Sequence, residues 1–177
     1  MLLASIILFS CKKSSPNNTQ NNNQNTGTGT TGSFSFNFNN TFIDGSGSAN
    51  HCVITDNYLY MGGYAGNVPG STQPKYSFFF NIKLPSNSIT LGTYSTNDNP
   101  NNYLDFQSER SVINNTTNYD DFSANQSTTG VMQVTINSYN PSTRIVNCSF
   151  SGTVSDDGNV NYNITNGTIS ANLYLNN

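Results

Sequence analysis

The sequence predicts an all-β fold, an antiparallel β-sandwich or barrel-like meander, behind a disordered N-terminal tether. Apolar and polar residues alternate with a period of two in several segments, as half-buried strands require. Short clusters of Asn, Asp, Gly and Pro separate these segments at intervals that suit short antiparallel strands. We find no apolar stripe with helical spacing. In a chain of 177 residues, we expect one β domain over residues 34–177, long enough to bury a core.

Residues 1–10 have the pattern of a signal peptide. An apolar block over residues 2–9 is too short to span a bilayer but long enough for a signal-peptide core. Cys11 follows the small residue Ser10 at the end of this block, which is the arrangement of a lipoprotein processing site. The block has no basic region before it and carries the bulky Phe9, so an ordinary cleaved signal or a frayed apolar end is the alternative.

Lipidation of Cys11 would decide where the protein acts. Palmitate and related acyl chains contribute about 0.8 kcal/mol per buried methylene, and more than one chain makes attachment stable. We therefore expect a lipoprotein of the cell envelope, anchored to the outer membrane and facing the periplasm or the exterior. Residues 11–33, rich in Asn, Gln, Thr and Gly, contain nothing to bury that would offset their ordering entropy. They predict a flexible tether with a reach of roughly 25 Å.

Two alternating segments predict the first long strands of the domain. In residues 34–38, three phenylalanines alternate with Ser and Asn. In residues 76–84, Tyr, Phe, Ile and Leu occupy every other position. Such alternation turns one side of each strand toward a core.

The dipeptide Asp56-Asn57 predicts a two-residue hairpin. Pairing outward from this turn sets Thr55 opposite Tyr58 and, further along, Cys52 opposite Met61. The register divides the side chains between two faces. One face carries Cys52, Ile54, Leu59 and Met61, and the other carries Val53, Tyr58 and Tyr60.

Residues 131–175 predict a four-stranded meander. Its connections are Asn140-Pro141, a loop at residues 156–158 and a type I′ turn at Asn166-Gly167. The register that follows places apolar pairs on one face. These pairs are Met132 with Phe150, Val154 with Val160, Phe150 with Ile164, and Ile164 with Ile169.

With Cys11 assigned to lipid, Cys52 and Cys148 are left as a pair. Both face inward on the predicted registers, and an even number of cysteines in an oxidising compartment suggests a disulfide. Closing so long a loop would contribute about 4.7 kcal/mol in the chain-entropy model. The alternative is two buried free thiols.

Several short motifs extend over most of the domain. They are Gly92-Thr93-Tyr94, Gly130 ahead of Val134 and Ile136, Phe150, and Thr165-Asn166-Gly167. Together with the Cys-Lys-Lys start and the Asn-rich tether, they resemble small lipoproteins of unknown function that are common in the Bacteroidota. Where that resemblance leads us to expect a glycine, this chain has Cys148, so the disulfide would be peculiar to it. The resemblance implies no activity.

Catalytic and metal-binding residues are scarce. The single histidine, His51, lies on the face opposite Cys52, which argues against a Cys/His pair. Zinc sites normally recruit several His or Cys ligands. Asp120-Asp121 and residues 156–159 lack the alternating ligands and closing glutamate of a calcium loop. We expect no metal site and no cofactor.

The low charge of the chain excludes nucleic acid as a partner, and the spacing of its few carboxylates argues against a glycoside hydrolase. Only 8% of the residues are charged and the net charge is −3, so no basic surface exists to neutralise nucleic acid. A glycoside hydrolase would have to use Glu109, the only glutamate, with Asp105, Asp120 or Asp121, and their spacing gives no support. We therefore expect no enzyme activity, with a hydrolase as the distant alternative.

Tyrosines are the candidate ligand-binding residues. Tyr58 and Tyr60 share the face away from Cys52, and Tyr64 and Tyr103 are expected nearby. Exposed tyrosines among amides and hydroxyls can hold a sugar by stacking and hydrogen bonding. The alternative is that this face packs against a second sheet. The sequence thus predicts a membrane-anchored, non-catalytic binding or structural module, with a glycan or an envelope protein as partner.

Overall fold

The computed structural model describes residues 32–45, 50–67, 74–113 and 116–174. Within these ranges the chain forms strands and no helix, so the all-β prediction is confirmed. The strands are β1 (Ser33–Phe38), β2 (Thr41–Asp44), β3 (Asn50–Thr55), β4 (Tyr58–Asn67), β5 (Pro74–Lys83), β6 (Gly92–Ser95), β7 (Tyr103–Ile113), β8 (Thr116–Ala124), β9 (Met132–Asn140), β10 (Ile145–Ser155) and β11 (Asn161–Asn172).

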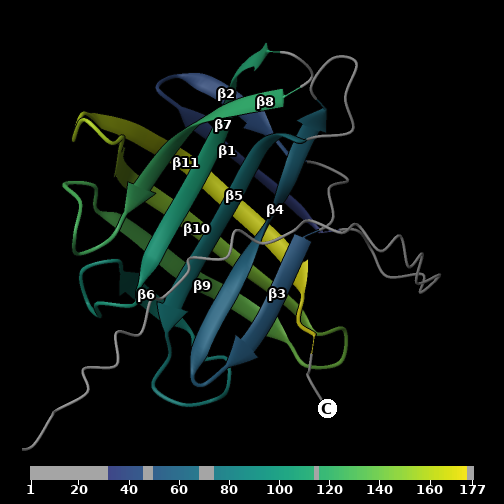
Figure 1. Ribbon diagram of the computed structural model, residues 1–177. Helices are drawn as coiled ribbons and strands as arrows, with labels where there is room; N and C mark the ends of the chain where they lie inside the picture. The colour runs from purple at the N-terminus through teal and green to yellow at the C-terminus, as the bar shows by residue number, and fades with distance from the viewer. Residues whose placement is uncertain (1–31, 46–49, 68–73, 114–115, 175–177) are drawn as a thin grey trace, which may run out of the picture.

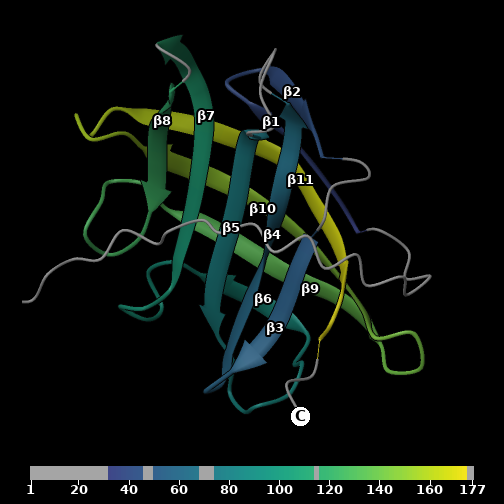
Figure 2. The ribbon, with the colours of Figure 1, turned by 45° about the vertical axis from the view of Figure 1, so that its right-hand side comes forward.

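The strands form two layers of one curled antiparallel sheet. One layer has the order β2-β1-β11-β10-β9-β6, and the other has the order β8-β7-β5-β4-β3. The layers join where Ser155 of β10 pairs with Ser123 of β8. Figure 1 shows β9, β10 and β11 crossing behind β3, β4, β5 and β7, and Figure 2 shows the sheet curling into a half-barrel.

A backbone contact connects the two layers a second time, away from the pair Ser155 and Ser123. The N–H of Tyr174, beyond β11, donates a hydrogen bond of 2.8 Å to the carbonyl oxygen of Cys52 on β3. Val53 and Tyr174 also form a short parallel bridge. This contact, which we call the seam, links the segment that follows β11 in the chain to β3, the end strand of the other layer.

Phenylalanine rings from both layers fill the space between them. Phe36 of β1 lies 5.2 Å from Phe78 and 5.2 Å from Phe106, measured between ring centroids. Phe78 of β5 stacks on Phe150 of β10 at 4.5 Å. The inward side of each alternating segment is therefore the side that the sequence predicted, and its burial drives the layers together.

The hairpin between β3 and β4 is confirmed pair by pair. Thr55 is opposite Tyr58 and Cys52 is opposite Met61, as the turn dipeptide predicted. Asp56 and Asn57 have φ values of 52° and 65°, the two left-handed residues that a type I′ turn requires.

The predicted hairpin at Asn166-Gly167 is wrong. β11 passes through these residues without turning, and β1 and β10 pair with it on either side. Asn166 has a φ of 53°, and the register shifts here, because Phe150 pairs with Gly167 whereas Gly152 pairs with Ile164. The dipeptide forms a β-bulge, which uses the same left-handed conformation as a type I′ turn. The meander therefore has three strands and not four.

The loop between β10 and β11 is longer than predicted. The carboxylate of Asp156 accepts hydrogen bonds of 2.9 Å from the N–H groups of Gly158 and Val160, which closes a wider turn. Val154 consequently pairs with Tyr162 and not with Val160, a shift of two residues.

The register between β9 and β10 differs by the same amount. Phe150 pairs with Val134, where the sequence predicted Met132. A further irregularity lies between Asn147 and Cys148. Because side chains alternate with a period of two, both displacements keep Met132, Phe150, Val154 and Ile164 facing the core. The exception is Val160, which lies before β11 and is 54% exposed, so its predicted place on the core face is wrong.

The predicted disulfide between Cys52 and Cys148 is absent, and both are free thiols. Both side chains do face the core, where they are 0% and 2% exposed. The Sγ of Cys148 lies 3.8 Å from the Sδ of Met61, the residue opposite Cys52 on β4. Each sulfur therefore fills apolar space in the core. Burial raises the pKa of both thiols, that of Cys52 to about 12.

The signal peptide, Cys11 and most of the tether lie outside the described residues. In the part of the chain that the structure does describe, no helix is long and apolar enough to cross a membrane.

Candidate functional site

The outward side of the layer β8-β7-β5-β4-β3 carries the candidate site, and we call it the outer face. Along β5, Phe78 and Phe80 are buried, while Phe79 between them points outward and is half-buried. Strand pairing sets Phe79 between Gly62 of β4 and Asp105 of β7. An aromatic residue at an outward position thus lies in the middle of the layer.

Three rings gather around Phe79. Tyr60 stacks nearly parallel to it, at 5.3 Å between centroids and 13° between planes. Tyr64 meets it edge-on at 5.2 Å and 72°, and His51 lies 6.2 Å away. We call these four residues the aromatic platform. Its stacked and edge-on contacts are the favoured geometries of aromatic pairs.

The platform is open to solvent. Tyr64 is 42% exposed, His51 is exposed, and Tyr60 is half-buried. The alternative that this face packs against a second sheet is wrong, since the second layer lies on the opposite side, against Leu59 and Met61. In Figure 2 the crossing strands β9, β10 and β11 lie on one side of β3, β4 and β5.

Tyr58, a predicted ligand-binding residue, is separated from the platform by its own contacts. Its hydroxyl donates to Oδ1 of Asn99 at 3.3 Å and accepts from Nδ2 of Asn101 at 3.1 Å. The Nζ of Lys83 lies 4.4 Å from the centroid of its ring. Tyr58 therefore holds the loop before β7, and of the three predicted tyrosines the structure brings together Tyr60 and Tyr64.

Asp105 lies close enough to the tyrosines of the outer face to help raise the pKa of their hydroxyls. Burial, then Tyr103, Tyr64 and Asp105, raise the pKa of Tyr60 above its usual range. Burial and then Asp105 raise the pKa of Tyr103. These hydroxyls therefore stay neutral near pH 7 and can both donate and accept hydrogen bonds.

The carboxyl group of Asp105 is itself unusual. Protein atoms crowd it, and this partial desolvation followed by repulsion from Asp121 raises its pKa to about 6. Its side chain nevertheless reaches water, because it lies in an open groove.

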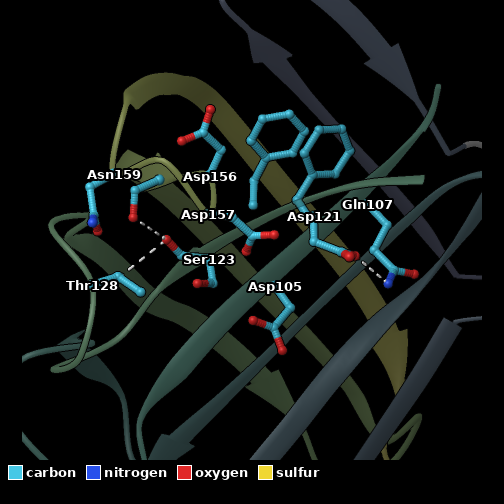
Figure 3. A pocket seen from close by; sticks show the side chains of 11 residues that line it. Asp105, Gln107, Asp121, Ser123, Thr128, Asp156, Asp157 and Asn159 are labelled. Atoms are coloured by element: carbon cyan, nitrogen blue, oxygen red, sulfur yellow. Dashed lines mark hydrogen bonds between the residues drawn. The ribbon is translucent and has the colours of Figure 1, made fainter. Parts of the chain in front are cut away.

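That groove, of about 460 Å³, lies between strands β7 and β8 and the loop between β10 and β11. Figure 3 shows Asp105, Gln107 and Asp121 entering it from the strands and Asp157 entering it from the loop. We call it the acidic groove. Its volume is within the range of about 300–1,000 Å³ that small-molecule sites occupy.

A short hydrogen-bond chain orders the groove wall nearest to the platform. The Oγ of Ser77 donates to Oε1 of Gln107 at 2.9 Å, and Nε2 of Gln107 donates to Oδ1 of Asp121 at 2.6 Å. Gln107 is thereby fixed in one orientation, and Asp121 is held in place.

The remaining residues weighed from the sequence take other positions. His51 belongs to the platform and does not lie with Cys52. Glu109 lies opposite Tyr119, whereas Asp105 and Asp121 both line the acidic groove. Among the described residues, no three His, Cys, Asp or Glu side chains are placed to hold a metal ion.

Sequence reasoning missed Phe79 and the role of Asp105. Phe79 had a detectable signal, because it is an aromatic residue at a position where alternation calls for a polar one. Asp105 had none, since its position depends on the pairing of β5 with β7.

Comparison of the chain with protein-family models, with curated proteins and with solved structures gave no match.

Proposed function

We propose that this protein is a non-catalytic glycan-binding module of the cell envelope and that the aromatic platform is its binding surface. The single observation that carries the proposal is the cluster of Tyr60, Tyr64 and Phe79 on an outward face, where burial of the core does not require it. A cluster of aromatic side chains on a solvent-exposed face of a sheet marks a binding site.

The chemistry of the platform suits a sugar ring. One side of a pyranose presents C–H groups that stack on flat aromatic rings, and the hydroxyls at its rim need donors and acceptors. The neutral hydroxyls of Tyr60 and Tyr103 and the carboxylate of Asp105 provide both beside the rings. A protein partner would be served by a larger apolar area.

Lipid attachment at Cys11 would place this surface at a membrane. The proposal for the anchor and for an outer-membrane location is supported by the sequence alone, through the apolar block and the cysteine after a small residue. The tether that composition predicts for residues 11–33 would let the domain sample glycans above the lipid headgroups.

A glycan array with the full chain in detergent, followed by calorimetry on the hits, tests the proposal. We expect Tyr64→Ala and Phe79→Ala each to weaken binding about fivefold or more, because each removes a stacking ring. Phe42→Ala is the matched control, since Phe42 is an aromatic residue 63% exposed on β2, in the other layer. Equal binding by all three variants and the wild type would refute the proposal.

A glycoside hydrolase is the second candidate, favoured by one observation. Asp105, with a pKa raised to about 6, and Asp121 line the same groove beside the platform. Glycosidases pair a carboxylic acid of raised pKa with a second carboxylate. Cleavage of the bound glycan by the wild type, lost in Asp105→Asn, would select this candidate over simple binding.

A further inference from the structure

We propose that a bound glycan extends from the aromatic platform into the acidic groove, and that the groove selects sugars carrying a protonated amine. This inference rests on the proposed function, because it names the substrate class of the same surface. It adds a second subsite and a charge preference.

Asp105 makes the two surfaces one site. It pairs directly with Phe79, the centre of the platform, and it lines the acidic groove together with Asp121 and Asp157. A ligand stacked on Tyr60 and Phe79 therefore reaches the groove by passing Asp105. The groove therefore begins at the residue that lies next to the platform.

The charge of the groove has one sign. The residues that line it include four aspartates, Asp105, Asp121, Asp156 and Asp157, and no Lys, Arg or His. Elsewhere in the described chain, Lys83 lies over the Tyr58 ring and Lys75 near the Tyr76 ring. The groove is thus an electrostatic partner for a cation and repels an anionic sugar.

The aspartates differ in how far they are already engaged. Asp156 accepts hydrogen bonds from Gly158, Val160 and Tyr162, so it holds the loop. Asp121 accepts from Gln107. Asp105 faces Tyr60 from β4, Tyr103 from its own strand and Asp121 from β8, with no cation among these groups.

An ammonium group on the ligand would relieve this arrangement. It would offset the repulsion between Asp105 and Asp121, and it would form charge-assisted hydrogen bonds, which are about twice as strong as neutral ones. A neutral hydroxyl or an N-acetyl group would leave the repulsion in place. Asp105 is therefore the residue that sets the preference between the two kinds of sugar.

A matched pair of ligands tests the inference by calorimetry at about pH 7, where Asp105 is largely ionised. The pair is an oligomer of glucosamine and an N-acetylglucosamine oligomer of equal length. We expect the aminated oligomer to bind the wild type roughly fivefold tighter, and added salt to reduce this difference.

Variants separate the two levels of the proposal. Asp105→Asn should abolish the preference by bringing the affinities for the two oligomers together, whereas Tyr64→Ala should weaken binding of both and keep the preference. Asp56→Asn is the charge-matched control, because it removes one carboxylate from the β3–β4 turn and keeps a residue suited to left-handed φ.

The outcomes are distinguishable. Equal affinity of the wild type for both oligomers, or a preference that persists in Asp105→Asn, would overturn the charge selection and leave the platform proposal standing. Binding of neither oligomer, together with no binding on the array, would overturn the proposed function. A third outcome is that an oligolysine binds the wild type as tightly as the aminated oligomer does, with an affinity that Tyr64→Ala leaves unchanged. That result would overturn the inference in favour of general cation attraction.

Discussion

Gly62 lies directly beneath the ring of Phe79. A Cβ atom built on Gly62 would be 2.3 Å from Cδ1 of that ring and 2.2 Å from the carbonyl oxygen of Phe78. The missing side chain is what lets Phe79 lie across β4 between its aromatic neighbours, a known way of covering a glycine in a sheet. The platform thus depends on a residue that contributes no side chain to it.

Gly62→Ala is therefore expected to destabilise the domain by about 1–3 kcal/mol, because the backbone of β5 must move to accept the methyl group. The same movement should displace Phe79 and weaken glycan binding. Urea denaturation and calorimetry measure the two effects. An unchanged unfolding midpoint would contradict the close approach.

The bulge at Asn166 predicts a selective response to substitution. With φ at 53°, Asn166→Gly should change stability little, whereas Asn166→Val should cost about 1–3 kcal/mol, since β-branched residues are strained in this region. Denaturation of the two variants side by side tests this. Equal stability of Asn166→Val and the wild type would mean that the bulge is absent.

The two core thiols should be unreactive until the domain unfolds. Burial raises the pKa of Cys52 to about 12 and raises that of Cys148 as well, so neither is a thiolate at pH 8. Native protein should show no alkylation at either position, and protein denatured without reductant should show alkylation at both. A mass corresponding to a bridge between them would contradict the free thiols.

Asp105 should make stability fall as pH rises from about 4 to about 6. Its pKa is raised in the folded state, from 3.8 to about 6, so the folded protein binds more protons than the unfolded one in this window. Asp105→Asn should therefore raise the melting temperature at pH 7 and leave it nearly unchanged at pH 4. Scanning calorimetry at the two pH values gives the comparison. A melting temperature that is lower in the variant at pH 7 would reverse the sign and refute the crowding of this carboxyl.

Cys11→Ser tests the proposed anchor. The wild type should incorporate labelled palmitate and fractionate with membranes, whereas the variant should do neither, because the acyl chains attach through that sulfur. Phe9→Ala serves as a control that keeps the cysteine. Equal distribution of wild type and Cys11→Ser would remove the envelope location from the proposal.

Local chemistry was sufficient at one turn and misleading at another. Asp56-Asn57 and Asn166-Gly167 both supply left-handed residues, and the first is the expected hairpin turn. The second is a bulge because β1, distant in sequence, pairs with β11 on the far side. A dipeptide specifies the backbone angles it can adopt but not the strands that will flank it.

The candidate site, too, could be predicted from the sequence only in part. Period-two alternation put Tyr60 on the outward side, and the structure agrees. The meeting of Phe79 with Asp105 and the groove beside them required the pairing of β5 with β7 and the position of the β10–β11 loop. These contacts join residues far apart in the chain, and alternation carries no information about them.

The seam between Tyr174 and Cys52 has a consequence for self-association. β3 ends one layer, and an end strand offers unpaired N–H and C=O groups to any extended chain that approaches. The hydrogen bond from Tyr174 occupies part of that row. Shortening the protein before Leu173 would remove this hydrogen bond and expose a row of backbone groups on which another chain could add a strand, the first step of fibril growth.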